Sequence, residues 1–237
     1  MTSACDRVLS TTELLEFILS HLTPINYLFQ AQRVSRFFHT TIQKSPKLQQ
    51  LLFMRAETCR SLEDYVTNQL LQQHFAPWFP PFQGRRNYDR LKEMEWASTP
   101  SLRAIYLRPE ASWRRMLPMQ PAPQTLSVQY LEHCQTGDFM ETASVEGATM
   151  GRVYDITESF LRAEYASYAQ FSMHCGGEGV VVYLESQMQC DMGEGRGLKG
   201  WDLKSEGAEM THELQWVDCG EVQGGGYRFG GMDSVFD

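Results

Sequence analysis

The sequence predicts an α+β protein, in which an N-terminal three-helix unit precedes a mixed domain with mostly antiparallel strands. Between Val8 and Phe53, apolar residues recur at helical spacing, and polar capping residues separate the runs. Further along the chain, short runs alternate apolar and polar residues, as half-buried strands do. Fourteen of the eighteen glycines then lie between Gly176 and Gly231, which indicates turns and loops between strands.

The first predicted helix begins after Ser10, because Ser10 and Glu13 have the spacing of a capping box. Its apolar stripe consists of Leu14, Leu15, Ile18, Leu19 and Leu22. Pro24 suits the first position of a second helix, since its missing N–H would have no partner there. That helix has an apolar face made of Ile25, Leu28 and Phe29.

A third helical face follows directly, and it is made of Ala31, Val34, Phe37, Phe38 and Ile42. Ser45 and Pro46 repeat the start by a capping residue and a proline, and three leucines follow them at helical spacing. A unit of this length has more large apolar side chains than it can bury by itself. We therefore expect part of this surface to meet another chain, or else the rest of this one.

In its order and spacing, this stretch resembles an F-box, in particular the F-box of filamentous-fungal proteins. The resemblance is carried by Glu13-Leu14-Leu15, Ile18-Leu19, Leu22, Pro24, Leu28, Val34-Ser35-Arg36, Phe38, Ile42, Ser45-Pro46, Leu48 and Phe53. The chain departs from the family pattern at Ser10-Thr11, Asn26-Tyr27 and Phe38. The resemblance implies docking on a Skp-family adaptor and, through it, on the cullin scaffold of an SCF-type ubiquitin ligase.

By this resemblance, the residues expected at the adaptor interface are Leu14, Leu15, Ile18, Leu19, Leu22, Pro24, Leu28, Val34 and Phe38. We expect about half of them to face the core instead, because amphipathic helices usually bury their stripe in their own domain. The C-terminal domain would hold a protein substrate, so that the chain acts as a tether without catalytic residues. Two alternatives remain: an F-box protein that acts outside a ligase, and an enzyme whose site lies in residues 83–237.

The chain divides into a helical unit over residues 1–56, a connecting segment over 57–100 and an α+β domain with a glycine-rich acidic end over 101–237. The connecting segment contains the aromatic residues Phe75, Trp78, Phe79 and Phe82 among several prolines. Such a group can form a patch for a partner, but it is more typical of a loop that covers a core.

In the third region, local patterns predict individual elements. Strands are expected at Leu102–Leu107, Leu126–Tyr130, Met150–Ile156, Val180–Leu184, Glu213–Val217 and Tyr227–Phe229. A short helix is expected over Glu110–Leu117, with Trp113, Met116 and Leu117 facing inward. Another helix is expected to begin at Asp155, with Glu158 as the third residue of its capping box.

Motifs for catalysis or for metal binding are weak. The run Gly195–Gly200 matches G-x-G-x-x-G, but no strand–helix context surrounds it. The cysteines and histidines of the C-terminal region lack the usual zinc-ligand spacing; these residues are His174, Cys175, Cys190, His212 and Cys219. We therefore expect a non-catalytic protein with no cofactor and no metal.

Charge and hydropathy narrow the class of partner. The net charge is −8, but residues 1–60 hold seven Lys or Arg and four acids, which leaves −11 for the remainder. An acidic body argues against nucleic acid as the main ligand, whereas the basic N-terminal unit suits an acidic protein. The absence of a long apolar run and of a signal peptide, together with scattered cysteines, predicts a cytoplasmic or nuclear protein without a membrane segment.

Overall fold

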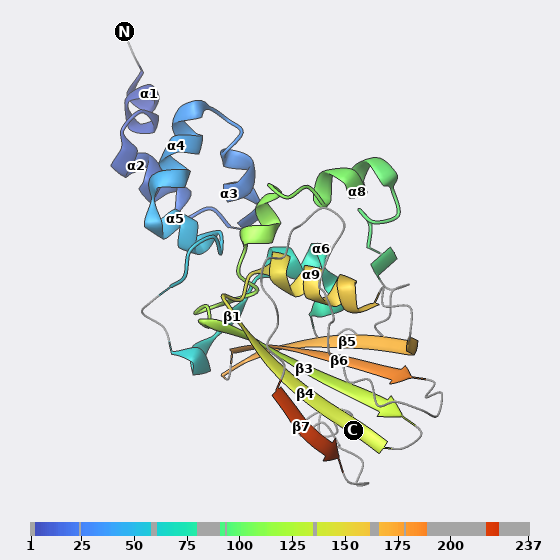
Figure 1. The fold of residues 1–237 in the computed structure, drawn as a ribbon. Helices are drawn as coiled ribbons and strands as arrows, with labels where there is room; N and C mark the ends of the chain where they lie inside the picture. Colours follow the sequence, from blue (N-terminus) through green and yellow to red (C-terminus); the bar gives the residue numbers. More distant parts are fainter. Residues whose placement is uncertain are drawn as a thin grey trace, which may run out of the picture.

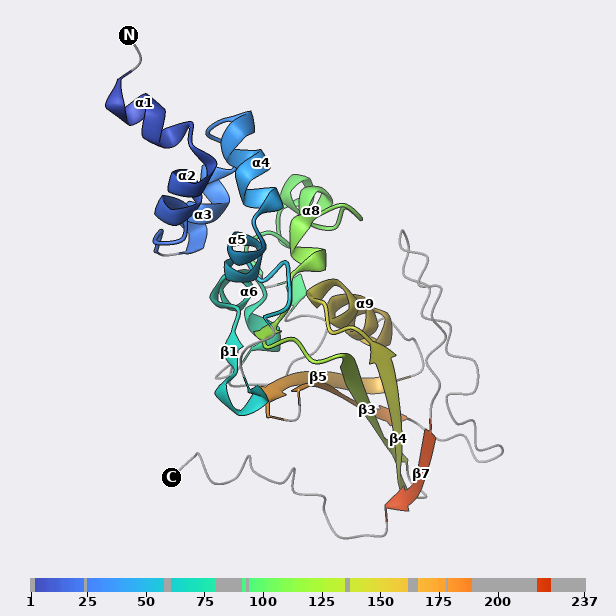
Figure 2. The same ribbon diagram turned by 90° about the vertical axis from the view of Figure 1, so that its left-hand side faces the viewer.

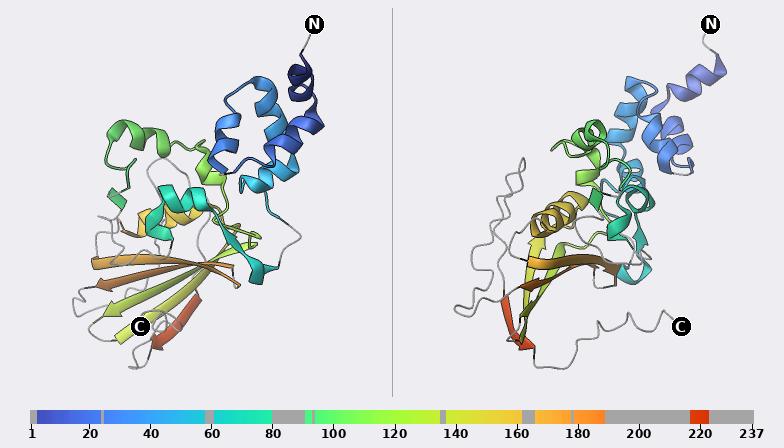
Figure 3. Two further views of the ribbon diagram at one scale, coloured as in Figure 1. Left: turned by 180° about the vertical axis from the view of Figure 1, so that it is seen from behind. Right: turned by 90° about the vertical axis from the view of Figure 1, so that its right-hand side faces the viewer.

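The computed structural model of the chain describes residues 3–23, 25–57, 61–79, 91–92, 94–134, 137–161, 166–177, 179–188 and 217–222. Figure 1 shows a group of short helices at the N-terminus and, below it, a twisted sheet with helices over one face. The same layers are seen from the side in Figure 2 and from behind in Figure 3. The predicted α+β class is therefore confirmed.

The N-terminal helices are α1 (Ala4–Leu9), α2 (Thr12–Leu19), α3 (Ile25–Ala31), α4 (Arg36–Lys44) and α5 (Pro46–Leu51). Ser35 begins α4, since its hydroxyl accepts a hydrogen bond from the Phe38 N–H. Ser45 begins α5 in the same way, with Pro46 in the first turn as predicted. The Ser45 hydroxyl also donates to Glu16 of α2 at 2.6 Å, so that this cap joins two helices.

The predicted capping box at Ser10 is wrong. The capping box lies one helix earlier, where the Ser3 hydroxyl accepts from the Asp6 N–H and the Asp6 carboxylate accepts from the Ser3 N–H. The hydroxyls of Ser10 and Thr11 both donate to the carbonyl of Arg7, at 3.1 and 2.8 Å. Because these hydroxyls are turned back toward α1, neither caps α2. The third predicted face is also shifted, since Ala31 ends α3 and Val34 lies in the turn before α4.

The connecting segment contains η1 (Leu62–Asp64), β1 (Val66–Thr67), α6 (Gln69–His74) and η2 (Ala76–Trp78). Asn68 begins α6 by accepting from the N–H groups of Leu70 and Leu71. Phe75, Trp78 and Phe79 are almost wholly buried, which confirms that the aromatic residues here cover a core. Phe82 lies outside the described residues.

Two predicted strands are helices. The segment expected as the strand Leu102–Leu107 forms α8 (Pro100–Tyr106), which begins with the Thr99-Pro100 pair and leaves Leu102 and Ile105 exposed. The segment Met150–Ile156 belongs to α9 (Met150–Leu161), whose buried residues include Met150, Val153, Tyr154, Thr157 and Phe160 at helical spacing. Asp155 is therefore a buried residue inside α9 and not its cap. The predicted short helix is the 3-10 turn η3 (Ser112–Arg115), with Trp113 and Met116 buried.

The main sheet has the strand order β5-β6-β3-β4-β7. Its strands are β3 (Thr125–Cys134), β4 (Gly137–Glu146), β5 (Ala166–Gly176), β6 (Gly179–Met188) and β7 (Val217–Val222). The predicted strands at Leu126–Tyr130 and Val180–Leu184 lie in β3 and β6, which pair in parallel, whereas the other neighbours are antiparallel. The helix α9 lies between β4 and β5 in the chain and covers one face of the sheet (Figure 1). Val217 begins β7, and the rest of the expected strand Glu213–Val217, like that at Tyr227–Phe229, lies outside the described residues.

The helical unit and the sheet domain are joined around Phe53. The Leu117 N–H donates to the Phe53 carbonyl at 2.8 Å, and the Gln120 side chain of β2 (Met119–Gln120) donates to the carbonyl of Gln50 at 2.6 Å. Phe29 and Met54 pack against both hydrophobic clusters. The boundary expected near residue 56 is thus crossed by both polar and apolar contacts.

One buried ion pair fastens η3 to α9. Arg114 and Asp155 are in direct contact, and their side chains are only 13% and 9% exposed. Burial raises the pKa of the Asp155 carboxyl more than its hydrogen bond with Arg114 lowers it, so the pair carries a desolvation penalty. We expect Asp155→Leu to lower the free energy of unfolding by about 3–5 kcal/mol, because Arg114 is left buried without its partner.

The control is Arg103→Met, because Arg103 is half exposed and lies 3.7 Å from Glu158. This change is expected to lower the free energy of unfolding by about 1 kcal/mol at most. Urea unfolding followed by circular dichroism measures both, and the double change Arg114→Met with Asp155→Leu is expected to recover much of the loss. Equal effects of the two single changes would contradict the structural role of the pair.

Candidate protein-docking face of the N-terminal helices

The nine residues expected at an interface fall into separate groups. Leu15, Leu19 and Leu28 are 0%, 2% and 1% exposed, so they belong to the interior of the helical unit. They pack there with Ala31, Ile42, Leu48 and Leu52. For these three leucines, an interface role in the folded unit is excluded, because their side chains do not reach the surface.

Leu22 and Phe38 are half-buried and pack against this interior. Pro24 lies outside the described residues. Leu14, Ile18 and Val34 are 46%, 41% and 67% exposed. Along α2, Leu14 and Ile18 therefore face outward, while Leu15 and Leu19 face inward.

The residue that the sequence-based prediction missed is Phe17, which is 64% exposed and lies on α2 beside Leu14 and Ile18. We call Leu14, Phe17 and Ile18 the α2 face. Their spacing of three and four residues could have revealed a second stripe beside the one that holds Leu15 and Leu19. Four other large apolar side chains in this unit are also exposed outside the prediction, namely Val8 of α1, Tyr27 of α3, Phe37 of α4 and Leu51 of α5.

The end of the α2 face is held by local contacts. The Phe17 and His21 rings lie 4.6 Å apart, and the Ser20 hydroxyl donates to the Phe17 carbonyl at 2.8 Å. The Lys47 ammonium donates to the same Ser20 hydroxyl at 3.3 Å, which places a positive charge beside this end of α2. The α2 face is thus apolar, with a basic neighbour, and it can bind a protein by burying apolar surface next to an acidic group.

Leaving the three large apolar side chains of the α2 face in contact with water is energetically unfavourable. Single exposed apolar residues are ordinary, but adjacent large ones on a single helix form a patch. Fully burying each such side chain would contribute about 1.5–3 kcal/mol. A helix of eight residues cannot bury both of its apolar stripes inside so small a unit, so the second stripe is available to a partner.

A metal site and a cysteine nucleophile both have little support among the described residues. In that part of the chain, no three histidine, cysteine or acidic side chains are grouped as metal ligands. Cys175 is buried, and burial raises the pKa of its thiol to about 12, which is unsuited to a nucleophile. His174 beside it is exposed. Cys190, His212 and Gly195–Gly200 lie outside the described residues.

A buried polar group lies under α9, where the Tyr130 hydroxyl contacts Ser186 at 2.6 Å and donates to Glu132 at 3.1 Å. Burial raises the pKa of Tyr130, so the phenol stays protonated and serves as a donor. The Tyr130 ring packs edge-on against Phe160, with the ring centroids 5.6 Å apart. These hydrogen bonds and this ring contact join β3 and β6 to α9.

No helix among the described residues is long and apolar enough to span a membrane. No protein-family model matches the chain. Searches of curated proteins and of solved structures also find no match.

The two faces of α2 predict losses of stability of different size when a charge is added. We expect Leu19→Asp to lower the free energy of unfolding by at least about 3 kcal/mol, because it removes core packing and buries a carboxylate. Its matched control is Ile18→Asp, which is expected to lower it by about 1 kcal/mol or less, because residue 18 meets solvent. Urea denaturation followed by far-ultraviolet circular dichroism measures both. A similar loss in the two variants would show that α2 is packed on both sides.

Proposed function

We propose that the chain is an F-box-type substrate receptor, which binds a Skp-family adaptor through its N-terminal helices and thereby joins an SCF-type ubiquitin ligase. The observation that carries the proposal is the α2 face, three large apolar side chains left exposed on one short helix. It coincides with the stretch whose residues resemble an F-box. Leu14 and Ile18 belong to both sets, which supports their assignment to the interface.

The charge of the unit favours an acidic partner. Residues 1–60 carry seven basic and four acidic side chains, whereas the chain as a whole has a net charge of −8. Lys47 lies beside Ser20 at the end of the α2 face. Opposite charges around an apolar patch speed association and orient the partner, while the patch itself provides most of the affinity.

In this role the chain is a tether. The sheet domain would hold a protein substrate, and the hydrogen bonds from Leu117 and Gln120 to the helical unit would fix the substrate's direction relative to the adaptor. A fixed direction raises the effective concentration of a substrate lysine near the conjugating enzyme. No catalytic residue of this chain is required for that step.

The test is co-expression with a Skp-family adaptor followed by size-exclusion chromatography. We expect a stoichiometric complex with the unchanged chain, and a loss of affinity of roughly hundredfold for Leu14→Asp with Ile18→Asp, because two anchoring side chains become charged. The matched control is Tyr65→Asp with Leu102→Asp, since these residues are 39% and 40% exposed but lie outside the helical unit.

Three results are informative. Equal binding by both double variants, each folded by circular dichroism, would contradict the α2 face as the interface. A folded unchanged chain that elutes alone would contradict the proposed function. If the adaptor binds but no cullin co-purifies with it, the chain acts with the adaptor outside a ligase.

A further inference from the structure

A cavity of about 250 Å³ lies at the junction between the helical unit and the sheet domain. Its lining comes mostly from α3, α6, α8, η3 and the segment that joins α8 to η3. Aromatic and aliphatic side chains make up most of the lining, among them Phe29, Leu70, Phe75, Tyr106 and Trp113. Sites for drug-sized ligands usually measure about 300–1,000 Å³, so this cavity suits a single large side chain better.

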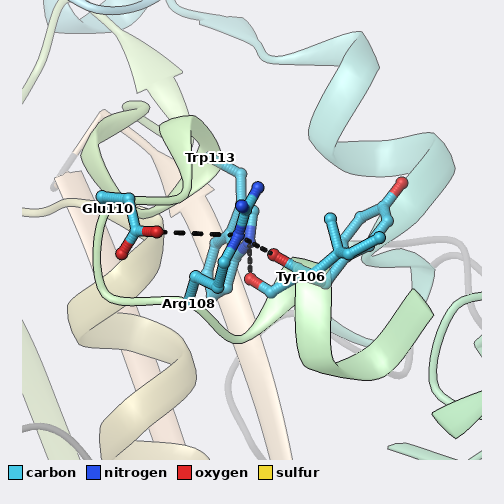
Figure 4. A network of polar contacts seen from close by, with 5 residues as sticks. Tyr106, Arg108, Glu110 and Trp113 are labelled. Atoms are coloured by element: carbon cyan, nitrogen blue, oxygen red, sulfur yellow. Dashed lines mark hydrogen bonds and ion pairs between the residues drawn. The ribbon is translucent and has the colours of Figure 1, made fainter. Parts of the chain in front are cut away.

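The walls are held by ring packing and hydrogen bonds. The Trp113 indole donates to the Tyr106 carbonyl at 2.6 Å, as Figure 4 shows, and the Trp96 indole donates to the His74 carbonyl at 2.9 Å. The Trp96 and Tyr106 rings are stacked with centroids 4.9 Å apart. Phe75 packs on Trp113 at 4.5 Å. These contacts fix the cavity before anything enters it, which lowers the entropy lost on binding.

The opening of the cavity continues into exposed apolar surface. Ile105 lines the cavity and is 49% exposed, and Leu102 lies one turn earlier on α8 and is 40% exposed. Residues three apart on a helix are neighbours on its surface. An entering chain would therefore meet apolar surface of α8 beside its anchor.

The positive charge at the cavity comes from Arg108, which lines it, and none of the described lining residues is acidic. The Arg108 Nε donates to the Ile105 carbonyl at 3.2 Å and lies 3.7 Å from Glu110, a residue that is itself largely exposed (Figure 4). An exposed ion pair of this kind contributes little stability, so Arg108 can exchange Glu110 for an acidic residue of a bound segment. Burial and, to a lesser extent, the charge of Glu95 raise the pKa of Tyr106, but Glu95 does not line the cavity.

We propose that this cavity binds a protein segment in which a large apolar side chain is flanked by an acidic residue, with the side chain in the cavity and the acid beside Arg108. The choice of a protein segment as the occupant rests on the proposed role as a substrate receptor. The acidic flank follows from the basic lining in a chain whose net charge is −8.

The test uses the full chain and an array of acetylated nine-residue peptides with Phe, Leu or Ser at the centre and Asp or Lys on either side. Fluorescence polarisation of labelled copies gives the affinities. We expect the Phe or Leu peptides with Asp flanks to bind at least about tenfold more tightly than those with Ser, because the anchoring side chain is lost. Lys flanks are expected to weaken binding about tenfold or more.

Two variants locate the binding. Ala111→Trp should abolish selective binding, because residue 111 lines the cavity and the larger side chain fills it. Arg108→Glu, a change at an exposed side chain, should instead reverse the preference from Asp to Lys flanks, and Tyr65→Asp should leave it unchanged. The inference is overturned if the array shows no preference for apolar centres, or if Arg108→Glu leaves the flank preference intact.

These outcomes are separate from those of adaptor binding. An adaptor complex without peptide selection removes only the cavity inference. Peptide selection by a chain that binds no adaptor removes only the proposed ligase role.

Discussion

The close packing of aromatic rings around Phe75, Trp78 and Tyr154 is the interaction on which the sheet domain depends. Phe75 lies between α6 and η2, Trp78 belongs to η2 and Tyr154 to α9. Trp78 also packs on Phe171 of β5 at 5.0 Å. The Trp78 indole donates to the Thr157 hydroxyl at 3.1 Å, so the buried polar atom is satisfied. Segments far apart in the chain thus share one core, and each ring buries roughly 150–250 Å² of surface.

This packing places α9 over the sheet. Parallel pairing of β3 with β6 requires a long connection, which runs through β4, α9 and β5, and α9 is the segment that crosses from β4 to β5. The ion pair between Arg114 and Asp155 fastens η3 to the same helix. Because η3 is fixed to α9, the segment between α8 and η3 is also fixed, and the junction cavity that it lines has rigid walls.

The helical unit follows a different rule, because it has more apolar surface than its own core can cover. Leu15 and Leu19 are used inside, while Leu14, Phe17 and Ile18 stay outside on the same helix. A protein that must bind another protein benefits from this division, since the buried stripe maintains the fold and the exposed stripe provides affinity. Under the proposed function, the adaptor covers the second stripe.

The sequence by itself determined the helix start at Ser45 and the strands around Val128 and Val182, because caps and alternating side chains act over a few residues. It could not decide between strand and helix for Met150–Ile156, where seven residues are too few to reveal a period. The burial of Asp155 against Arg114 and the inward or outward direction of Leu15 and Leu14 were decided by the tertiary structure. These features depend on contacts between residues far apart in the chain, such as the 41 positions that separate Arg114 from Asp155.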